Sequence, residues 1–121
     1  MGDLTRERAL ELAQAWIDAW NAHDLDAILA HYADEVEFIS PFVQRLLGDP
    51  SGIVRGKAAL RDYFARGLAS YPDLRFDLLE VLAGVRSVTV YYRSVRGLLA
   101  AEVMCLADDG RVERVLAHYT G

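Results

Sequence analysis

Three side chains of this sequence are the leading candidates for chemistry, namely Ser40, Tyr92 and His118. A serine hydroxyl acts as a nucleophile or base only when another group activates it, and Tyr92 is the partner that we expect for Ser40. The imidazole of His118 titrates near neutral pH and suits a general base. Alternation along the last predicted strand turns His118 outward, however, so His118 meets Glu102 in a pocket only if the strand register slips by one residue. Two catalytic pairs therefore remain open: Ser40 with Tyr92, or His118 with Glu102.

Aromatic and hydroxyl side chains predict a pocket around these candidates. Together they form an apolar chamber with a few hydroxyl groups, which is typical of a site for a flat or aliphatic organic molecule. We therefore expect a small apolar or aromatic ligand. The residues predicted to line the chamber are Trp16, Phe38, Ser40, Tyr63, Tyr92, Ser94, Val103 and Tyr119.

The histidine and cysteine residues do not predict a metal site or a cofactor. His23, His31 and His118 lack the spacing of metal ligands. Cys105 is the single cysteine and cannot form an internal disulfide. We therefore expect no metal and no cofactor.

Hydrophobic periodicity predicts the elements that position these side chains. Apolar residues at helical spacing indicate a helix over about 4–20, a short helix capped by Asp24 and a third helix that starts after Gly56. Alternating residues indicate later strands, and Pro41 ends the first of them because proline cannot donate to a sheet ladder. The predicted strands lie at about 36–40, 74–83, 86–95, 98–107 and 111–119, with a long loop over 42–55. This order predicts an α+β fold.

Two tight turns determine the predicted register of the last three strands. Arg96-Gly97 is typical of a two-residue hairpin loop, and Asp108-Asp109-Gly110 of a three-residue loop. Directly opposed residues share a face, so these turns assign an inner and an outer set. The predicted inner set is Val90, Tyr92, Ser94, Leu99, Ala101, Val103, Val115, Ala117 and Tyr119. The predicted outer set is Tyr91, Arg93, Glu102, Met104, Arg114, Leu116 and His118.

The predicted outer face suggests how the molecule associates. It mixes large apolar groups with charges, which is more typical of an oligomer interface than of bare solvent exposure. On this face Arg93 and Glu102 are interpreted as a surface or interface ion pair. We therefore expect a homodimer through the outer face of the sheet.

Composition limits the remaining possibilities. A chain of 121 residues that is 53% hydrophobic predicts a single domain over 1–121 with a sizeable core. Its net charge of −5 argues against a nucleic-acid-binding surface. No apolar run is long enough to span a membrane, and the N-terminus lacks an apolar targeting segment. A cytoplasmic location is the expectation.

Two stretches resemble a known superfamily. Residues 16–28 (WIDAWNAHDLDAI) and 32–36 (YADEV) resemble the nuclear transport factor 2-like superfamily, and its SnoaL-like branch is the most similar. Residues 56–60 (GKAAL) and 110–112 (GRV) strengthen the resemblance. It implies a conical barrel, in which helices cover the concave face of a curved, mostly antiparallel sheet. It also implies one deep apolar pocket and frequent dimerisation.

The resemblance also implies where catalytic groups belong. Ketosteroid isomerases of this superfamily use an aspartate base, with a tyrosine and a protonated aspartic acid as hydrogen-bond donors. The matching positions here hold Ser40, Trp16 and a site near Leu99, so that mechanism is not expected. The Asp-Arg-Asp relay of limonene-epoxide-hydrolase-type relatives is not found at inward positions either. The predicted function is binding of a small, mostly apolar molecule. The alternative is an isomerase, polyketide-cyclase-like or epoxide-hydrolase-like enzyme with a non-standard catalytic group.

Overall fold

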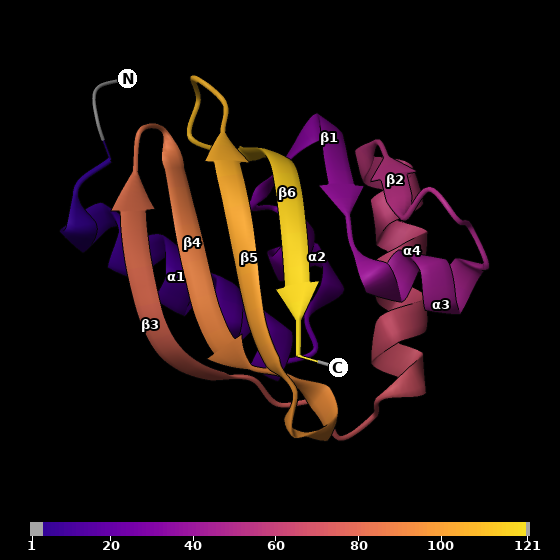
Figure 1. Ribbon diagram of the computed structural model, residues 1–121. Helices are drawn as coiled ribbons and strands as arrows, with labels where there is room; N and C mark the ends of the chain where they lie inside the picture. Colours follow the sequence, from indigo (N-terminus) through magenta and orange to yellow (C-terminus); the bar gives the residue numbers. More distant parts are fainter. Residues whose placement is uncertain (1–3, 121) are drawn as a thin grey trace.

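The computed structural model describes residues 4–120, which form one curved sheet covered on its concave face by helices (Figure 1). The helices are α1 (Arg6–Asn21), α2 (Leu25–Leu29), α3 (Pro41–Leu47) and α4 (Lys57–Ser70). The strands are β1 (Tyr32–Ile39), β2 (Ile53–Arg55), β3 (Asp77–Gly84), β4 (Ser87–Arg93), β5 (Leu99–Leu106) and β6 (Val112–Tyr119). A tight turn over Val95–Gly97, in which Arg96 and Gly97 have positive φ, joins β4 to β5.

The sheet has the order β2-β1-β6-β5-β4-β3. Strands β1 and β6 pair in parallel, and every other neighbouring pair is antiparallel. The sheet is open, with β2 and β3 at its edges. The prediction of an α+β fold with a curved, mostly antiparallel sheet is confirmed.

Helix α1 supplies much of the core. Thr5 caps its start by accepting a hydrogen bond from the Arg8 backbone N–H at 3.2 Å. Its buried face carries Ala13, Trp16, Ile17 and Trp20 at helical spacing. This face packs behind the sheet, where Figure 1 shows α1 crossing β3 to β5.

The segment that follows β1 differs from the predicted loop over 42–55. Residues Pro41–Leu47 form α3, and Ile53–Arg55 pair with β1 as β2. Pro41 does end the strand, but it also opens a helix, since proline lacks only an N–H that a first helical residue leaves unpaired. The Ser40 hydroxyl caps this helix by accepting from the Phe42 N–H at 3.1 Å.

The predicted register is wrong at β5. The tight turn forms, because the Leu98 N–H donates to the Val95 carbonyl at 3.1 Å, but the Ser94 N–H also donates to the Leu98 carbonyl at 2.7 Å. Ser94 and Val95 therefore both stand opposite Leu98, and one extra residue enters on the β4 side. As a result, Val90 pairs with Glu102 instead of Val103.

A second irregularity restores the predicted face of β6. The three-residue loop forms as expected, because the Ala107 N–H donates to the Arg111 carbonyl at 2.8 Å. The register then shifts between Cys105 and Leu106, which places Glu102 opposite Ala117. The two shifts cancel for β6 but not for β5. Only β5 is reversed: its inner residues are Ala100, Glu102 and Met104, and its outer residues are Leu99, Ala101 and Val103.

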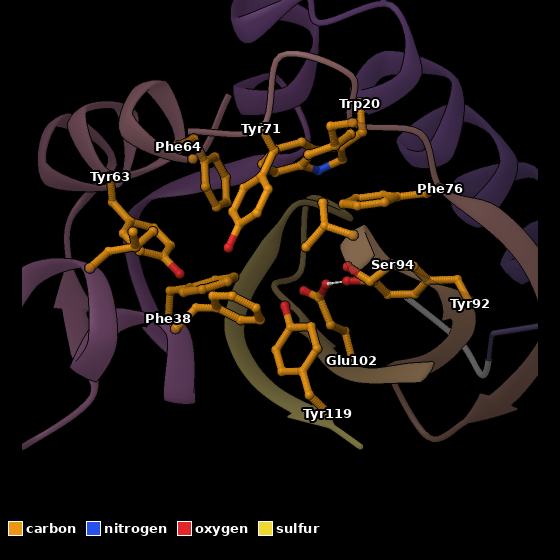
Figure 2. Close-up of a pocket in the computed structure, with 15 residues that line it drawn as sticks. Trp20, Phe38, Tyr63, Phe64, Tyr71, Phe76, Tyr92, Ser94, Glu102 and Tyr119 are labelled. Carbon is orange, nitrogen blue, oxygen red and sulfur yellow. Dashed lines mark hydrogen bonds between the residues drawn. The ribbon is translucent and has the colours of Figure 1, made fainter. Parts of the chain in front are cut away.

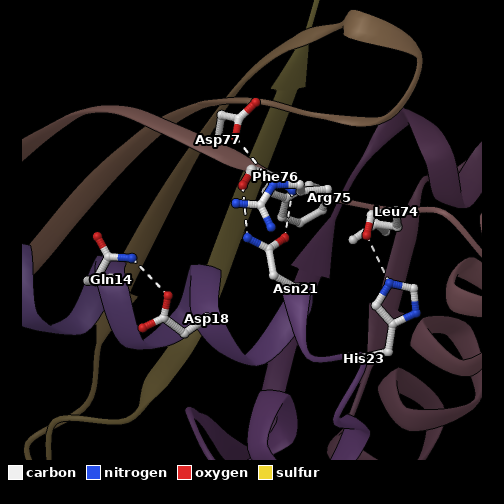
Figure 3. Close-up of polar contacts among 8 residues, drawn as sticks. All are labelled: Gln14, Asp18, Asn21, His23, Leu74, Arg75, Phe76 and Asp77. Carbon is white, nitrogen blue, oxygen red and sulfur yellow. Dashed lines mark hydrogen bonds and ion pairs between the residues drawn. The ribbon is translucent and has the colours of Figure 1, made fainter.

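Polar contacts hold the segment before β3 against the end of α1 (Figure 3). The Asn21 side chain donates to the Phe76 carbonyl at 2.9 Å and accepts from the Phe76 N–H at 2.7 Å. The His23 ring contacts the Leu74 carbonyl at 2.8 Å. The predicted strand therefore begins at Asp77 rather than near Leu74, and these contacts position Leu74 and Phe76 beside the pocket described below.

Candidate functional site

An aromatic pocket lies between the concave face of the sheet and the helices α1, α3 and α4 (Figure 2). Its cavity volume is about 60 Å³. Its walls come from every helix except α2 and from four strands, so residues distant in sequence meet there. The lining residues are Trp20, Phe38, Phe42, Leu46, Tyr63, Phe64, Gly67, Tyr71, Leu74, Phe76, Tyr92, Ser94, Val95, Glu102 and Tyr119.

Glu102 is the carboxyl group of this pocket. It lies in the middle of β5 and is 3% exposed. The Tyr92 hydroxyl donates a hydrogen bond to Glu102 Oε2. Glu102 Oε1 has no hydrogen-bond partner in the described part of the chain. A buried carboxyl with one unpartnered oxygen facing a cavity can accept a proton or donate one to a bound molecule.

Burial determines the ionisation of Glu102. It raises the pKa of Glu102 to about 7, and the hydrogen bond from Tyr92 opposes this increase. The protonated and ionised forms are therefore both populated near neutral pH. Because this pKa lies near the pH of a neutral solution, the same carboxyl can act as a base when ionised and as an acid when protonated.

Tyrosine hydroxyls surround the carboxyl. Burial raises the pKa of Tyr92 and of Tyr119, and the charge of Glu102 raises both further. Figure 2 shows the Tyr119 hydroxyl directed toward the Glu102 carboxyl group. Because both phenols stay protonated at neutral pH, they act as hydrogen-bond donors and not as bases.

Ser40 does not occupy the place expected of a nucleophile. It is buried, and its hydroxyl caps α3. Burial raises the pKa of Tyr63, and hydrogen bonding to Ser40 lowers it. Ser40 is not among the residues that line the pocket, but its hydroxyl hydrogen-bonds to two of them, Tyr63 and Tyr119. The structure pairs Tyr92 with Glu102, so the predicted pair of Ser40 with Tyr92 is not formed.

Three other residues of the predicted site lie elsewhere. Trp16 is buried, but its indole N–H donates to the Tyr32 hydroxyl at 2.9 Å, away from the pocket lining. Val103 is on the outer face, because the register of β5 is reversed relative to the prediction. His118 is exposed on the outer face, opposite Ala101. The alternative pair of His118 with Glu102 is therefore also wrong, since only Glu102 turns inward.

The remaining predicted residues do meet at the pocket wall, namely Phe38, Tyr63, Tyr92, Ser94 and Tyr119. The sequence-based prediction missed Trp20, Phe42, Leu46, Phe64, Gly67, Tyr71, Leu74, Phe76, Val95 and Glu102 as lining residues. One signal for Glu102 was available. It is the single acidic residue in the stretch LLAAEVMCLA, where a charged side chain is unusual unless it has a function or a partner.

Metal-binding clusters and membrane-spanning helices are both absent from the part of the chain that the structure describes. No group of three or more His, Cys, Asp or Glu within residues 4–120 is arranged to hold a metal ion. Among the helices described, none combines the length and the apolar character that crossing a membrane requires.

Comparisons with known proteins show which family the chain resembles. A model of the SnoaL-like domain matches residues 13–120. A crystal structure of a SnoaL-like protein of unknown function from Burkholderia thailandensis is 48% identical, with a TM-score of 0.95 over 98% of this chain and 99% of that one. A comparison with curated proteins finds no match.

Two more distant structures share the fold. A proposed ketosteroid isomerase from Kribbella flavida is 23% identical, with a TM-score of 0.73, and the match covers 95% of this chain and 79% of that one. A proposed isomerase of the SnoaL-like family from Agrobacterium tumefaciens is 17% identical, with a TM-score of 0.75 over 93% and 97% of the two chains. At these identities the likeness extends to the fold alone.

Proposed function

The chain belongs to the SnoaL-like domain family, and from that premise we propose that it catalyses a proton transfer on a small, mostly apolar carbonyl compound. One observation carries the proposal: Glu102, with a pKa of about 7, presents an unpartnered oxygen to an aromatic pocket. The proposed isomerases from Kribbella flavida and Agrobacterium tumefaciens have the same fold as this chain. In this proposal Glu102 transfers the proton, whereas the sequence-based prediction left two pairs open, Ser40 with Tyr92 or His118 with Glu102.

The proposed step is a proton shuttle. The ionised Glu102 removes a proton from the carbon next to the ligand's carbonyl group. The electron pair of that C–H bond forms a C=C bond to the carbonyl carbon, and the π electron pair of the carbonyl moves to its oxygen, which gives an enolate. Glu102, now protonated, returns a proton to the same or to another carbon, and the carbonyl is restored; in D₂O the proton on Glu102 is replaced by solvent deuterium before it is returned, so the product carries deuterium. The balance needs no other reactant. The aromatic walls limit water at the site, which strengthens the electrostatic interactions of the enolate oxygen with nearby donors.

The size of the cavity restricts the substrate. A volume of about 60 Å³ is far below the roughly 300–1,000 Å³ of pockets that enclose drug-sized ligands. A second hollow of about 360 Å³ shares Tyr71, Leu74, Ser94 and Val95 with the pocket and opens beside it. The inner cavity therefore suits a small carbonyl compound, or the small carbonyl end of a larger ligand.

Deuterium exchange tests the proposal. In D₂O, the protein is expected to exchange the protons beside the carbonyl of cyclopentanone, followed by NMR. The variant Glu102→Gln keeps the shape of the side chain but cannot take up the proton, so the catalysed rate should fall at least about a hundredfold. The control Glu113→Gln changes an exposed acid on β6 and should keep the wild-type rate. Equal rates in the wild type and Glu102→Gln would contradict the proposal.

Binding without turnover is the second candidate, and the aromatic lining of the pocket favours it. Apolar walls bind an organic molecule whether or not Glu102 reacts. On this reading, cyclopentanone raises the melting temperature of the wild type and of Glu102→Gln by similar amounts, and neither protein catalyses exchange. Exchange that depends on Glu102 would exclude this candidate.

A further inference from the structure

Two buried polar atoms lack a hydrogen-bond partner in the described part of the chain, and both belong to residues of the same pocket. They are Trp20 Nε1 and Glu102 Oε1. Trp20 is 7% exposed and Glu102 is 3% exposed, so neither atom relies on bulk water. Buried polar groups are nearly always paired, and an unpaired group costs stability. Both atoms are therefore positioned for a partner that the folded chain does not supply.

Trp16, one helical turn earlier on α1, shows that the missing partner is specific to Trp20. The Trp16 N–H donates to the Tyr32 hydroxyl of β1 at 2.9 Å, whereas no residue within 4–120 offers an acceptor to the Trp20 N–H. The Trp20 ring is held by Phe64 at 4.8 Å and Phe76 at 5.4 Å between ring centroids. Figure 2 shows its nitrogen on the edge of the ring that faces the pocket.

The chemistry of the two atoms defines what complements them. An indole N–H is a donor only, so its partner must be an acceptor. Glu102 Oε1 accepts a proton in the ionised form and donates one in the protonated form. A ligand that satisfies both has an acceptor oxygen at one point and an acidic proton at the other, as a carbonyl compound with an adjacent C–H does.

We infer that Trp20 is a substrate-binding residue whose N–H donates a hydrogen bond to the ligand's carbonyl oxygen while Glu102 faces the adjacent C–H. The inference rests on the proposed function, because it names the substrate class of that same pocket. It predicts that ketones bind in preference to hydrocarbons of the same shape. It also places a donor where negative charge develops when the enolate forms, a position at which hydrogen bonds contribute strongly to catalysis.

The indole signals in ¹⁵N–¹H NMR spectra test this inference directly. The sequence contains two tryptophans, so two indole signals are expected, and the variants Trp16→Phe and Trp20→Phe assign them. Cyclopentanone is then compared with methylenecyclopentane, in which a CH₂ group replaces the carbonyl oxygen. The ketone should shift the Trp20 indole proton downfield, the hydrocarbon should not, and the Trp16 proton should move little with either compound.

The affinities of the protein for cyclopentanone and for methylenecyclopentane provide a second test. Trp20→Phe keeps an aromatic ring but removes the N–H, so the preference for the ketone over the hydrocarbon should fall roughly three- to tenfold. Trp16→Phe, the matched control, should keep the wild-type preference. If Trp20→Phe does not fold, the indole shifts of the wild type still decide.

Several results would overturn the inference. One is an unchanged preference for the ketone over the hydrocarbon in Trp20→Phe. Another is a shift of the Trp20 indole proton that is equal with both compounds. A third is no shift with either compound, which is expected if the N–H instead points at the Phe64 ring. The test of this inference can fail while the test of the proposed proton transfer succeeds. Loss of exchange in Glu102→Gln together with unchanged ketone preference in Trp20→Phe would remove the inference and leave the function standing.

Discussion

At the scale of single residues, burial rather than an ion pair sets the pKa of the carboxyl group in the pocket. Glu102 is enclosed by apolar rings and has one hydrogen-bond donor, Tyr92, on one of its two oxygens. In the unfolded chain the same carboxyl has an ordinary pKa of 4.5, and folding raises the pKa to about 7. The pocket therefore has a measurable effect on stability as well as on chemistry.

Stability should fall as pH rises toward neutrality. Between pH 4.5 and about 7 the unfolded chain loses the Glu102 proton while the folded protein keeps it. The free energy of unfolding should therefore decrease over this window, by at most about 3 kcal/mol. Urea unfolding at a series of pH values measures this change, and Glu102→Gln should remove most of it. A wild-type and a Glu102→Gln protein with the same pH dependence would contradict the assigned pKa.

Removing the Tyr92 hydroxyl should move the pKa of Glu102 further upward. The hydrogen bond from Tyr92 favours the ionised carboxyl, so Tyr92→Phe favours the protonated form. The pH profile of cyclopentanone exchange should then shift to higher pH. Tyr91→Phe, on the outer face of the same strand, is the control and should leave the profile in place. A shift to lower pH in Tyr92→Phe would contradict this arrangement.

At the scale of elements, two one-residue irregularities determine which side chains reach the pocket. The extra residue at Ser94-Val95 reverses β5, and the shift beside Cys105 returns β6 to its expected face. The tight turns themselves were predictable from Arg96-Gly97 and Asp108-Asp109-Gly110. The irregularities next to them have no local sequence signal, since they satisfy packing between strands and not turn chemistry.

The helices and the fold class were predictable because long apolar stripes and caps are local signals. The α1 stripe through Trp16 and Trp20 and the alternation along β4 and β6 gave the correct faces. The short helix α3 was missed because Ser40-Pro41 is compatible with both a strand end and a helix start. Glu102 was placed on the wrong face for the same reason that Val103 was placed in the pocket: both depend on the register of β5.

The cap of α3 gives a prediction that separates structure from catalysis. Ser40→Ala removes the acceptor of the Phe42 N–H, so the free energy of unfolding should fall by about 1 kcal/mol. Exchange activity should change little, because Ser40 is outside the pocket lining. Thr5→Ala at the cap of α1 is a matched control with a comparable cost. A full loss of exchange in a stable Ser40→Ala protein would restore Ser40 as a catalytic residue.

At the scale of the whole molecule, we propose that the outer face of the sheet joins two copies of the chain. Leu82 on β3 is 57% exposed and lies across from Thr89, on the same outer face as Tyr91. Exposed apolar side chains on one sheet face are typical of an interface. The homodimer expected from the sequence is thus kept as a proposal, with β5 now contributing Ala101 and Val103 to that face.

A charge on this face should separate the subunits. Leu82→Arg is expected to convert a dimer to a monomer in size-exclusion chromatography with light scattering, because an unpaired charge in an apolar interface is costly. Val85→Arg, in the turn after β3, changes a more exposed residue and is expected to leave the dimer intact. A monomeric wild type at high concentration would contradict the proposed interface.

The central claim, that Glu102 transfers the proton, is tested most directly by the pH profile of cyclopentanone exchange in the wild type and in Glu102→Gln. The wild-type rate above background should rise with pH through about 7, as the carboxyl loses its proton, and then level off. Glu102→Gln should remain at background throughout. A Glu102→Gln protein that exchanges at the wild-type rate, with the same rise through neutral pH, would contradict the account.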